Sequence, residues 1–149
     1  MPSESTLGIY IHVPFCVRKC PYCDFYSVPQ TAERIEQYGT ALCRFLRQMQ
    51  TDLPVDTIYF GGGTPSLLPV SLLEEILQTI ARTVSLQQPE ITLECNPATV
   101  NRETLRQLRE IGINRLSIGV QSLSDVQLKR LGRLHDAKTA IETVEQAAT

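Results

Sequence analysis

Four short runs of strand-forming residues, each followed by a helix pattern, constrain the fold of this chain more than any other feature. Alternating strands and helices favour parallel pairing, because a parallel neighbour needs a long return connection and a helix supplies it. The chain is therefore predicted to be an α/β protein built from successive strand–helix units. The four runs are residues 8–13, 55–60, 90–95 and 115–120.

Apolar spacing and capping residues mark the predicted helices. The first helix carries apolar residues three and four positions apart, which is the spacing of one buried face. Ser71 and Glu74 form a capping box that predicts the start of the second helix. Gly112 is placed to end the third helix in the left-handed conformation, and a last helix is expected over residues 136–144. The apolar residues of the first helix are Ile35, Tyr38, Leu42, Phe45, Leu46 and Met49.

Side chains of the predicted strands divide into an aliphatic face and a polar face, because successive residues of a strand point to opposite sides. In the first strand, Tyr10 and His12 share one face, and the opposite face is aliphatic. The third and fourth strands repeat this division. A closed eight-stranded barrel fills its interior with bulky side chains, so a polar inner face favours an open sheet that holds a ligand. The site is expected at the carboxyl ends of the strands.

Three cysteines follow the first strand within eight residues, in the segment HVPFCVRKCPYC. Cys16, Cys20 and Cys23 have CxxxCxxC spacing on a loop that also contains two prolines. Thiolates are soft ligands that favour iron–sulfur clusters, zinc or copper(I) over hard cations. Three thiolates on a four-iron cluster leave one iron without a protein ligand, and an external amine and carboxylate can chelate that iron.

Other interpretations of the cysteines remain open at this stage. A structural zinc site with His12 as fourth ligand fits the residue types, since Cys3His sites are common. Surface thiols without metal, or a disulfide with one spare thiol, are further alternatives. Cys43 and Cys95 fall in a predicted helix and on the aliphatic face of a predicted strand. They are most simply small buried hydrophobic residues.

Charge and hydropathy argue against several other classes of protein. Fourteen basic and sixteen acidic side chains give a formal net charge of -2 at pH 7, without the basic block that binds a phosphate backbone. Nucleic acid is therefore not expected as a partner. No apolar run approaches the roughly eighteen residues of a transmembrane span. Crowded cysteines in an odd total number suit a metal site in a reducing compartment, so the cytoplasm is the expected location.

Four further sequence blocks lie at or after the predicted strands and helices. Together with CxxxCxxC they resemble the radical S-adenosylmethionine (SAM) superfamily, in the branch of HemW-like haem chaperones and oxygen-independent coproporphyrinogen III oxidases. The resemblance implies a partial (βα) barrel with parallel strands. Cores of this family contain about six βα units, so the four units found here imply an N-terminal part, residues 1–149, that lacks the remaining strands and the C-terminal domain. The blocks are FGGGTPS at 60–66, LECNP at 93–97, SIGVQS at 117–122 and LGRLHD at 131–136.

The resemblance also implies which residues meet the cofactors. It implies a [4Fe–4S] cluster on Cys16, Cys20 and Cys23, and SAM at eight further positions. Taken alone, the residues leave simpler interpretations open: a tight turn for the glycine run, an ion pair with arginine for Glu94, and ordinary packing for the two tyrosines. The eight positions are Tyr10, Tyr22, Gly62, Gly63, Thr64, Glu94, Gln121 and Arg133.

Two departures from the oxidase pattern favour the haem chaperones. The oxidases usually carry another cysteine two residues after the third ligand, where this chain has Asp24 and Phe25, and their motif follows a longer leader. The resemblance thus implies haem trafficking, with haem or a porphyrin as ligand and haem-acceptor proteins and an electron donor as partners. The alternatives are oxidative decarboxylation of coproporphyrinogen III and a zinc-stabilised module without redox chemistry. The shared family chemistry is one-electron reductive cleavage of SAM to a 5′-deoxyadenosyl radical.

Overall fold

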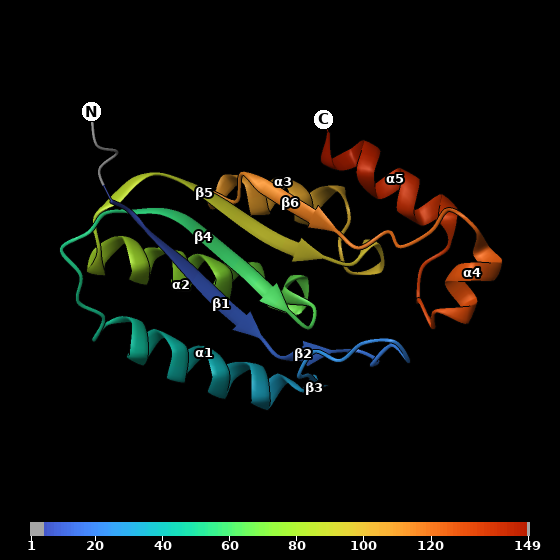
Figure 1. The fold of residues 1–149 in the computed structure, drawn as a ribbon, viewed down its shortest axis with the longest axis horizontal. Coiled ribbons are helices and arrows are strands. Elements are labelled where there is room, and N and C mark those ends of the chain that lie inside the picture. The colour runs from blue at the N-terminus through green and yellow to red at the C-terminus, as the bar shows by residue number, and fades with distance from the viewer. Residues whose placement is uncertain (1–4, 149) are drawn as a thin grey trace.

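A four-stranded parallel sheet forms the centre of the computed structural model, which describes residues 5–148 (Figure 1). The strands lie side by side in the same order as they occur along the chain. All three pairings in this sheet are parallel, so the α/β prediction is confirmed. The strands are β1 (Leu7–Val13), β4 (Val55–Gly62), β5 (Leu86–Cys95) and β6 (Arg115–Ile118).

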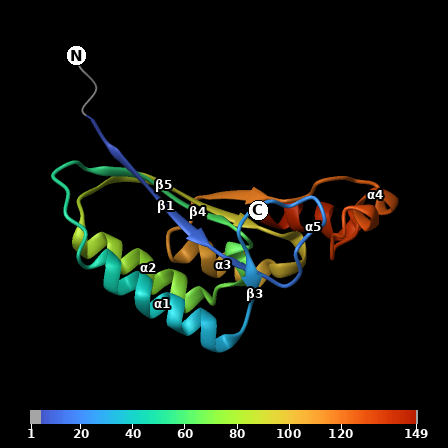
Figure 2. The same cartoon turned by 60° about the horizontal axis from the view of Figure 1, so that its bottom comes forward.

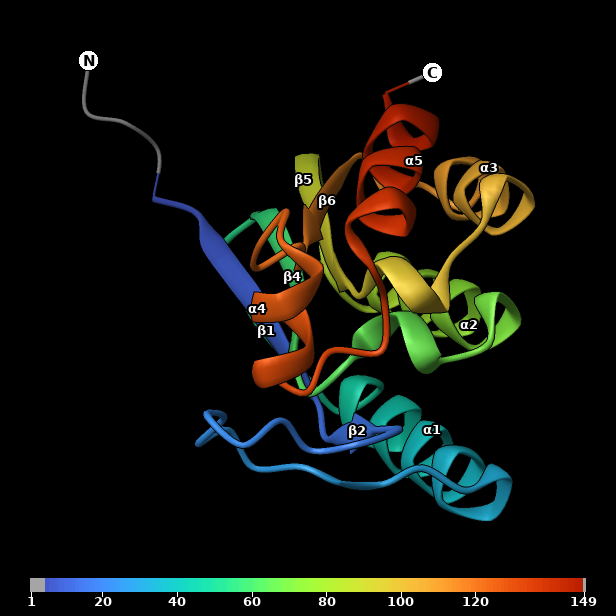
Figure 3. The same ribbon diagram turned by 90° about the vertical axis from the view of Figure 1, so that its right-hand side faces the viewer.

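Helices connect the strands and cover one side of the sheet. Figure 2 shows α1, α2 and α3 together on the same side. Figures 1 and 3 show α4 and α5 after β6, near the end of the molecule to which the strands point. The helices are α1 (Ala32–Leu46), α2 (Val70–Thr83), α3 (Arg102–Glu110), α4 (Asp125–Arg130) and α5 (Ala137–Ala147), with 3-10 turns η1 (Pro65–Leu67) and η2 (Pro97–Thr99).

The hydrophobic core lies between the sheet and its covering helices. Ile11, Phe60 and Leu93 come from three neighbouring strands, and each is at most 3% exposed. They belong to one apolar cluster with Leu73 and Ile76 of α2. The aliphatic face predicted from alternation is therefore the face that the helices bury, because removing these side chains from water is the main gain of packing the two layers.

The opposite face of the sheet carries the predicted polar residues. Tyr10 of β1 is paired with Tyr59 of β4, and Glu94 of β5 is paired with Ser117 of β6. Figure 2 shows this face on the side away from α1, α2 and α3. It is the surface on which a ligand can reach the strands.

Two helix boundaries were predicted correctly, and one capping interaction was not. Gly112 follows α3 with a φ of 107°, and the Asp136 side chain accepts from the backbone of the first turn of α5. The capping box at Ser71 is wrong, because the N-cap of α2 is Pro69, two residues before Ser71, and the helix begins at Val70. A proline fixes φ near the value that leads into a helix, so the chain turns before Ser71 is reached. Ser71 therefore lies inside the first turn.

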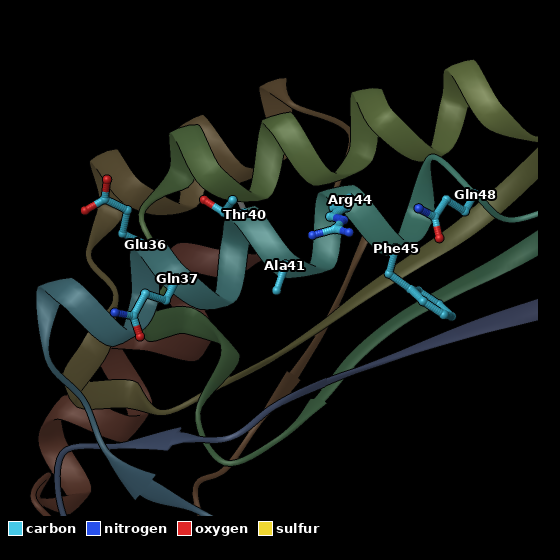
Figure 4. A pocket seen from close by; sticks show the side chains of 7 residues that line it. All are labelled: Glu36, Gln37, Thr40, Ala41, Arg44, Phe45 and Gln48. Carbon is cyan, nitrogen blue, oxygen red and sulfur yellow. The ribbon is translucent and has the colours of Figure 1, made fainter.

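Phe45 does not join the buried side of α1, contrary to prediction. Its side chain is 67% exposed, whereas Cys43 and Leu46 are each 2% exposed. The buried line on α1 runs through Gly39, where an added Cβ would lie 2.5 Å from Leu72 of α2. This close approach of the two helices sets which side of α1 faces inward. Figure 4 shows Phe45 beside Ala41, Arg44 and Gln48 around a surface hollow.

Candidate functional site

The three clustered cysteines lie on the loop that follows β1, at the carboxyl end of the sheet. Cys16 belongs to the short strand β2 (Phe15–Cys16), which pairs with β3 (Val28–Pro29). Cys20 and Cys23 lie in the connection between these strands, and the amide of Cys23 donates to the carbonyl of Cys20 over 3.1 Å. All three are half-buried free thiols. Phe15, at the start of this loop, is 2% exposed and packs into the hydrophobic core.

The glycine turn after β4 is hydrogen-bonded to the start of the cysteine loop. The Gly63 amide donates to Val13 and the Thr64 amide donates to Phe15, both over 2.8 Å. An added Cβ at Gly63 would lie 2.6 Å from the Phe15 carbonyl oxygen and 3.1 Å from the Cys16 sulfur. Only glycine permits this approach without displacing backbone. The run therefore brings half-buried backbone close to the thiol of Cys16.

Glu94 occupies the polar face at the end of β5, where two donors hold its carboxylate. The Tyr59 hydroxyl donates to Oε1 over 2.7 Å, and the Gly62 amide donates to Oε2 over 3.1 Å. Among residues 5–148, no arginine or lysine pairs with Glu94. The ion-pair alternative considered from the sequence is therefore not what the structure contains.

Arg133 reaches the cysteine loop from the turn after α4. Its Nη2 donates to the Gly119 carbonyl over 2.9 Å, and its Nη1 lies 3.7 Å from the Cys20 sulfur and 3.4 Å from the Tyr22 hydroxyl. Its Nε is buried and makes no hydrogen bond to any described residue. A buried donor without a partner is costly, so this nitrogen is suited to an acceptor on a ligand.

Gln121 follows the end of β6 in a strained conformation. Its φ is 66°, in the left-handed region that glutamine rarely adopts. Such strain persists where the surrounding structure holds it, and it is frequent at ligand sites. The Val120 carbonyl just before it lies 3.0 Å from Nε2 of the buried His135. The ring of His135 thereby fixes the entry to this turn.

A cavity of about 240 Å³ brings most of the predicted site residues together. It is bounded by the cysteine loop, the glycine turn and the ends of β5 and β6. Tyr10 is absent from its lining, since that ring lies further back on the open sheet face. The predicted residues in the lining are Tyr22, Cys23, Gly62, Gly63, Thr64, Glu94, Gln121 and Arg133.

Cys16 and Cys20 do not line this cavity, but each lies close to a residue that does. The Cys16 sulfur lies 3.7 Å from the Thr64 hydroxyl, and the Cys20 sulfur lies 3.7 Å from Arg133. Within residues 5–148, no three His, Cys, Asp or Glu side chains lie close enough together to hold a metal ion. The fold thus places the three thiols on one loop, and ligation of a shared metal centre requires that loop to bring its sulfurs together.

Other lining residues were not singled out from the sequence. They are Phe25, Pro65, Cys95, Asn96, Ser117 and Gly119. Strand alternation places Ser117 and Gly119 on the polar face of the sheet. That signal alone could have identified them as site residues. Phe25 comes from the irregular loop after Cys23, where no periodic pattern indicates the direction of a side chain.

His12 is not positioned as a fourth metal ligand. Its Nδ1 lies 3.1 Å from the Tyr10 hydroxyl, and its Nε2 lies 3.2 Å from the Tyr26 carbonyl oxygen. Both ring nitrogens therefore have partners other than the cysteines. A zinc site on these cysteines with His12 as fourth ligand would have to break both contacts.

The donor set fits an iron–sulfur cluster together with a polar, zwitterionic ligand. Three thiols supply soft ligands, the backbone of Gly63 borders the cavity next to Cys16, and Arg133 presents an unused buried donor. The Glu94 carboxylate is already held by two donors, and it can accept a further hydrogen bond from an ammonium or a hydroxyl group of a ligand.

The five thiols should differ in reactivity. Burial raises the pKa of Cys95 to about 11 and also raises the pKa of Cys43, so at pH 8 roughly one Cys95 in a thousand is a thiolate. We expect brief alkylation of metal-free protein at pH 8 to label the three loop cysteines first, as measured by peptide mass spectrometry. Labelling of Cys95 should rise as the pH approaches 11. Equal labelling of all five thiols in the native protein, as in urea, would contradict this.

Comparisons with known proteins show what this chain is similar to. The family model of the radical SAM superfamily matches residues 10–149. The heme chaperone HemW of Haemophilus influenzae is 39% identical over 158 aligned positions, which cover 99% of this chain and 41% of that protein. HemW of Escherichia coli is 40% identical over 149 positions, covering 95% of this chain and 39% of that protein.

A solved structure and a mitochondrial protein are similar as well. The E. coli coproporphyrinogen III oxidase HemN, described as a radical SAM enzyme, has a TM-score of 0.88 at 25% identity and covers 97% of this chain and 35% of its own. The bovine mitochondrial radical S-adenosyl methionine domain-containing protein 1 is 33% identical over 98% of this chain and 34% of its own length. The chain thus spans between 34% and 41% of these curated relatives. None of the helices within residues 5–148 has the length and apolar character needed to cross a bilayer.

Proposed function

The chain belongs to the radical SAM superfamily, and from that premise we propose that Cys16, Cys20 and Cys23 hold a [4Fe–4S] cluster beside the cavity. SAM occupies the cavity itself. When bound, the cluster supplies the electron for reductive cleavage of SAM. The observation that carries the proposal is the convergence of the cysteine loop, the glycine turn and the strand ends on one cavity of about 240 Å³.

Each part of the cavity has a role suited to its chemistry. The backbone at Gly62 and Gly63 and the Thr64 hydroxyl meet the amino-acid portion of SAM, because all three residues line the cavity. The carboxylate of Glu94 accepts from an ammonium or a ribose hydroxyl. Arg133 offers its buried Nε to a carboxylate or a ribose oxygen.

Gln121 and the two tyrosines complete the proposed SAM site. Gln121, whose backbone is left-handed, lines the cavity. Its side-chain amide can both donate and accept hydrogen bonds there. Tyr22, whose hydroxyl lies 3.4 Å from Arg133, borders the same cavity. Tyr10 does not line the cavity. It lies on the open sheet face and contacts His12 of β1 and Tyr59 of β4.

Haem trafficking is the function that the sequence relationships favour. Relatives at 39% and 40% identity are named heme chaperone HemW, whereas the oxidase HemN is similar at 25%. Asp24 and Phe25 stand where the oxidases usually have a further cysteine. The proposed ligand is haem or a porphyrin, passed to haem-acceptor proteins, with a separate electron donor. Three free loop thiols suit a reducing compartment such as the cytoplasm.

Anaerobic reconstitution with iron and sulfide tests the cluster and SAM together. The reduced sample should give an electron paramagnetic resonance signal of a [4Fe–4S] cluster, and that signal should change when SAM is added. Stoichiometric zinc without iron or sulfide would instead support a structural metal module. An unchanged signal with SAM would remove SAM from the proposal while leaving the cluster.

A second measurement separates the chaperone from the oxidase. Haem titrated into the reconstituted chain should bind and then pass to an apo-acceptor such as apomyoglobin. Anaerobic conversion of coproporphyrinogen III by the chain, without haem transfer, would favour the oxidase alternative, which the structural similarity to HemN supports.

A further inference from the structure

Tyr59 was not predicted as a site residue, yet it makes the shortest contact to the carboxylate at the end of β5. We propose that Tyr59 is a positioning residue that fixes the direction in which Glu94 presents its carboxylate to SAM. This inference rests on the proposed function, because it concerns the SAM-contacting role of Glu94. Tyr59 acts through Glu94 and does not itself line the cavity.

Two donors at opposite ends of the carboxylate determine its orientation. The Gly62 amide, fixed in the backbone, donates to Oε2, and the Tyr59 hydroxyl donates to Oε1 over 2.7 Å. One bond alone would let the carboxylate swing about that contact, whereas two bonds hold its plane. Hydrogen bonds to a charged acceptor are also stronger than neutral ones. The remaining lone pairs of Glu94 are therefore left facing a defined direction.

The Tyr59 hydroxyl remains a donor throughout the neutral range of pH. The bond to the Glu94 carboxylate raises the pKa of Tyr59 above its usual value near 10, and partial burial adds to this increase. A phenolate would repel the carboxylate that it now binds. The hydrogen bond from Tyr59 to Glu94 is therefore kept throughout this pH range.

The Tyr59 ring is itself held by a neighbouring tyrosine. Its centroid lies 6.0 Å from that of Tyr10, with 25° between the ring planes. Gly61 lies beneath both rings, and an added Cβ there would be 2.8 Å from Tyr59 and 3.0 Å from Tyr10. The missing side chain at Gly61 is what allows the stack to lie on the sheet. Stacking of this kind limits the positions that a partly exposed ring can adopt.

The same row of side chains continues to the cysteine loop. The Tyr10 hydroxyl lies 3.1 Å from His12, and the other ring nitrogen of His12 lies 3.2 Å from the Tyr26 carbonyl oxygen. Contacts therefore run from Glu94 through Tyr59, Tyr10 and His12 to the segment just after Cys23. This row gives Tyr10 a role at the site although it does not line the cavity.

The test is SAM affinity of anaerobically reconstituted protein carrying Tyr59→Phe. Phenylalanine keeps the stacked ring and removes only the hydroxyl, so thermal stability should change little. The dissociation constant for SAM, measured by calorimetry, should rise about tenfold, in the range expected for losing a hydrogen bond to a charged group. Tyr26→Phe is the matched control: it keeps the backbone carbonyl that contacts His12 and removes only an exposed hydroxyl, which makes no hydrogen bond within the described part of the chain. It should leave the dissociation constant unchanged.

A double-mutant cycle with Glu94→Ala separates positioning from direct contact. Once Glu94 is gone, adding Tyr59→Phe should alter SAM affinity by less than about twofold, because the two residues act as one unit. A similar tenfold loss in both backgrounds would overturn the proposal, as would wild-type affinity in the single variant. Wild-type protein that binds no SAM would overturn the proposed function itself, whereas normal wild-type binding with an inert Tyr59→Phe overturns this inference alone.

Discussion

Cys20→Ser is expected to reduce the iron retained after anaerobic reconstitution by more than about tenfold. The substitution removes one of three thiolates, and a serine hydroxyl is a hard, weakly acidic ligand that does not replace it. The Cys20 sulfur also lies 3.7 Å from Nη1 of Arg133, so the change removes this contact. The loss is measured by iron and sulfide assays and by the visible absorption of the cluster.

The matched control removes a thiol from outside the loop. Cys43→Ala changes a buried residue of α1 and should retain cluster content close to wild type, with only a modest loss of stability. Retention of full iron and sulfide by Cys20→Ser would contradict the assignment of the loop cysteines. Equal loss in both variants would show that the effect comes from folding and not from ligation.

Phe60→Ala is expected to lower the free energy of unfolding by about 3–5 kcal/mol. Phe60 is fully buried on the middle of β4, on the face that the helices cover. Truncation removes the apolar ring and leaves a cavity between the sheet and α2 that close-packed neighbours only partly fill. Urea denaturation followed by circular dichroism, fitted with a common slope, measures the difference.

Phe45→Ala makes the same change of side chain on the surface of α1. Because the Phe45 ring is 67% exposed, we expect the free energy of unfolding to stay within about 0.5 kcal/mol of wild type. A loss at Phe45 as large as that at Phe60 would mean that α1 buries a different side than the structure describes. The two variants together therefore test the position of the core as well as its strength.

Local patterns predicted most of the architecture. Alternation of Tyr10 and His12 with aliphatic neighbours identified the open face, and the position of Gly112 identified the end of α3. These signals succeed because side-chain direction repeats every second residue in a strand, and because few residues other than glycine accept a left-handed helix end. The cysteine spacing likewise defines a soft ligand set before any fold is known.

The failures occur where a neighbouring element decides the outcome. The helical spacing includes both Phe45 and Leu46, and only the close approach of α2 at Gly39 shows which of them is covered. Ser71 has the composition of a cap, but the preceding Pro69 begins the helix first. A pattern within one helix carries no information about the angle at which a second helix packs against it.

Residue types and their periodicity were enough to establish a parallel α/β sheet with one polar face and three thiols at its carboxyl end. The folded chain alone decides which donors hold Glu94, since Tyr59 lies 35 positions away, and that Arg133 approaches Cys20 across 113 positions. Periodicity reports the direction of a side chain relative to its own backbone. Contacts between distant segments depend instead on strand register and on packing between layers, which arise only when the whole chain folds.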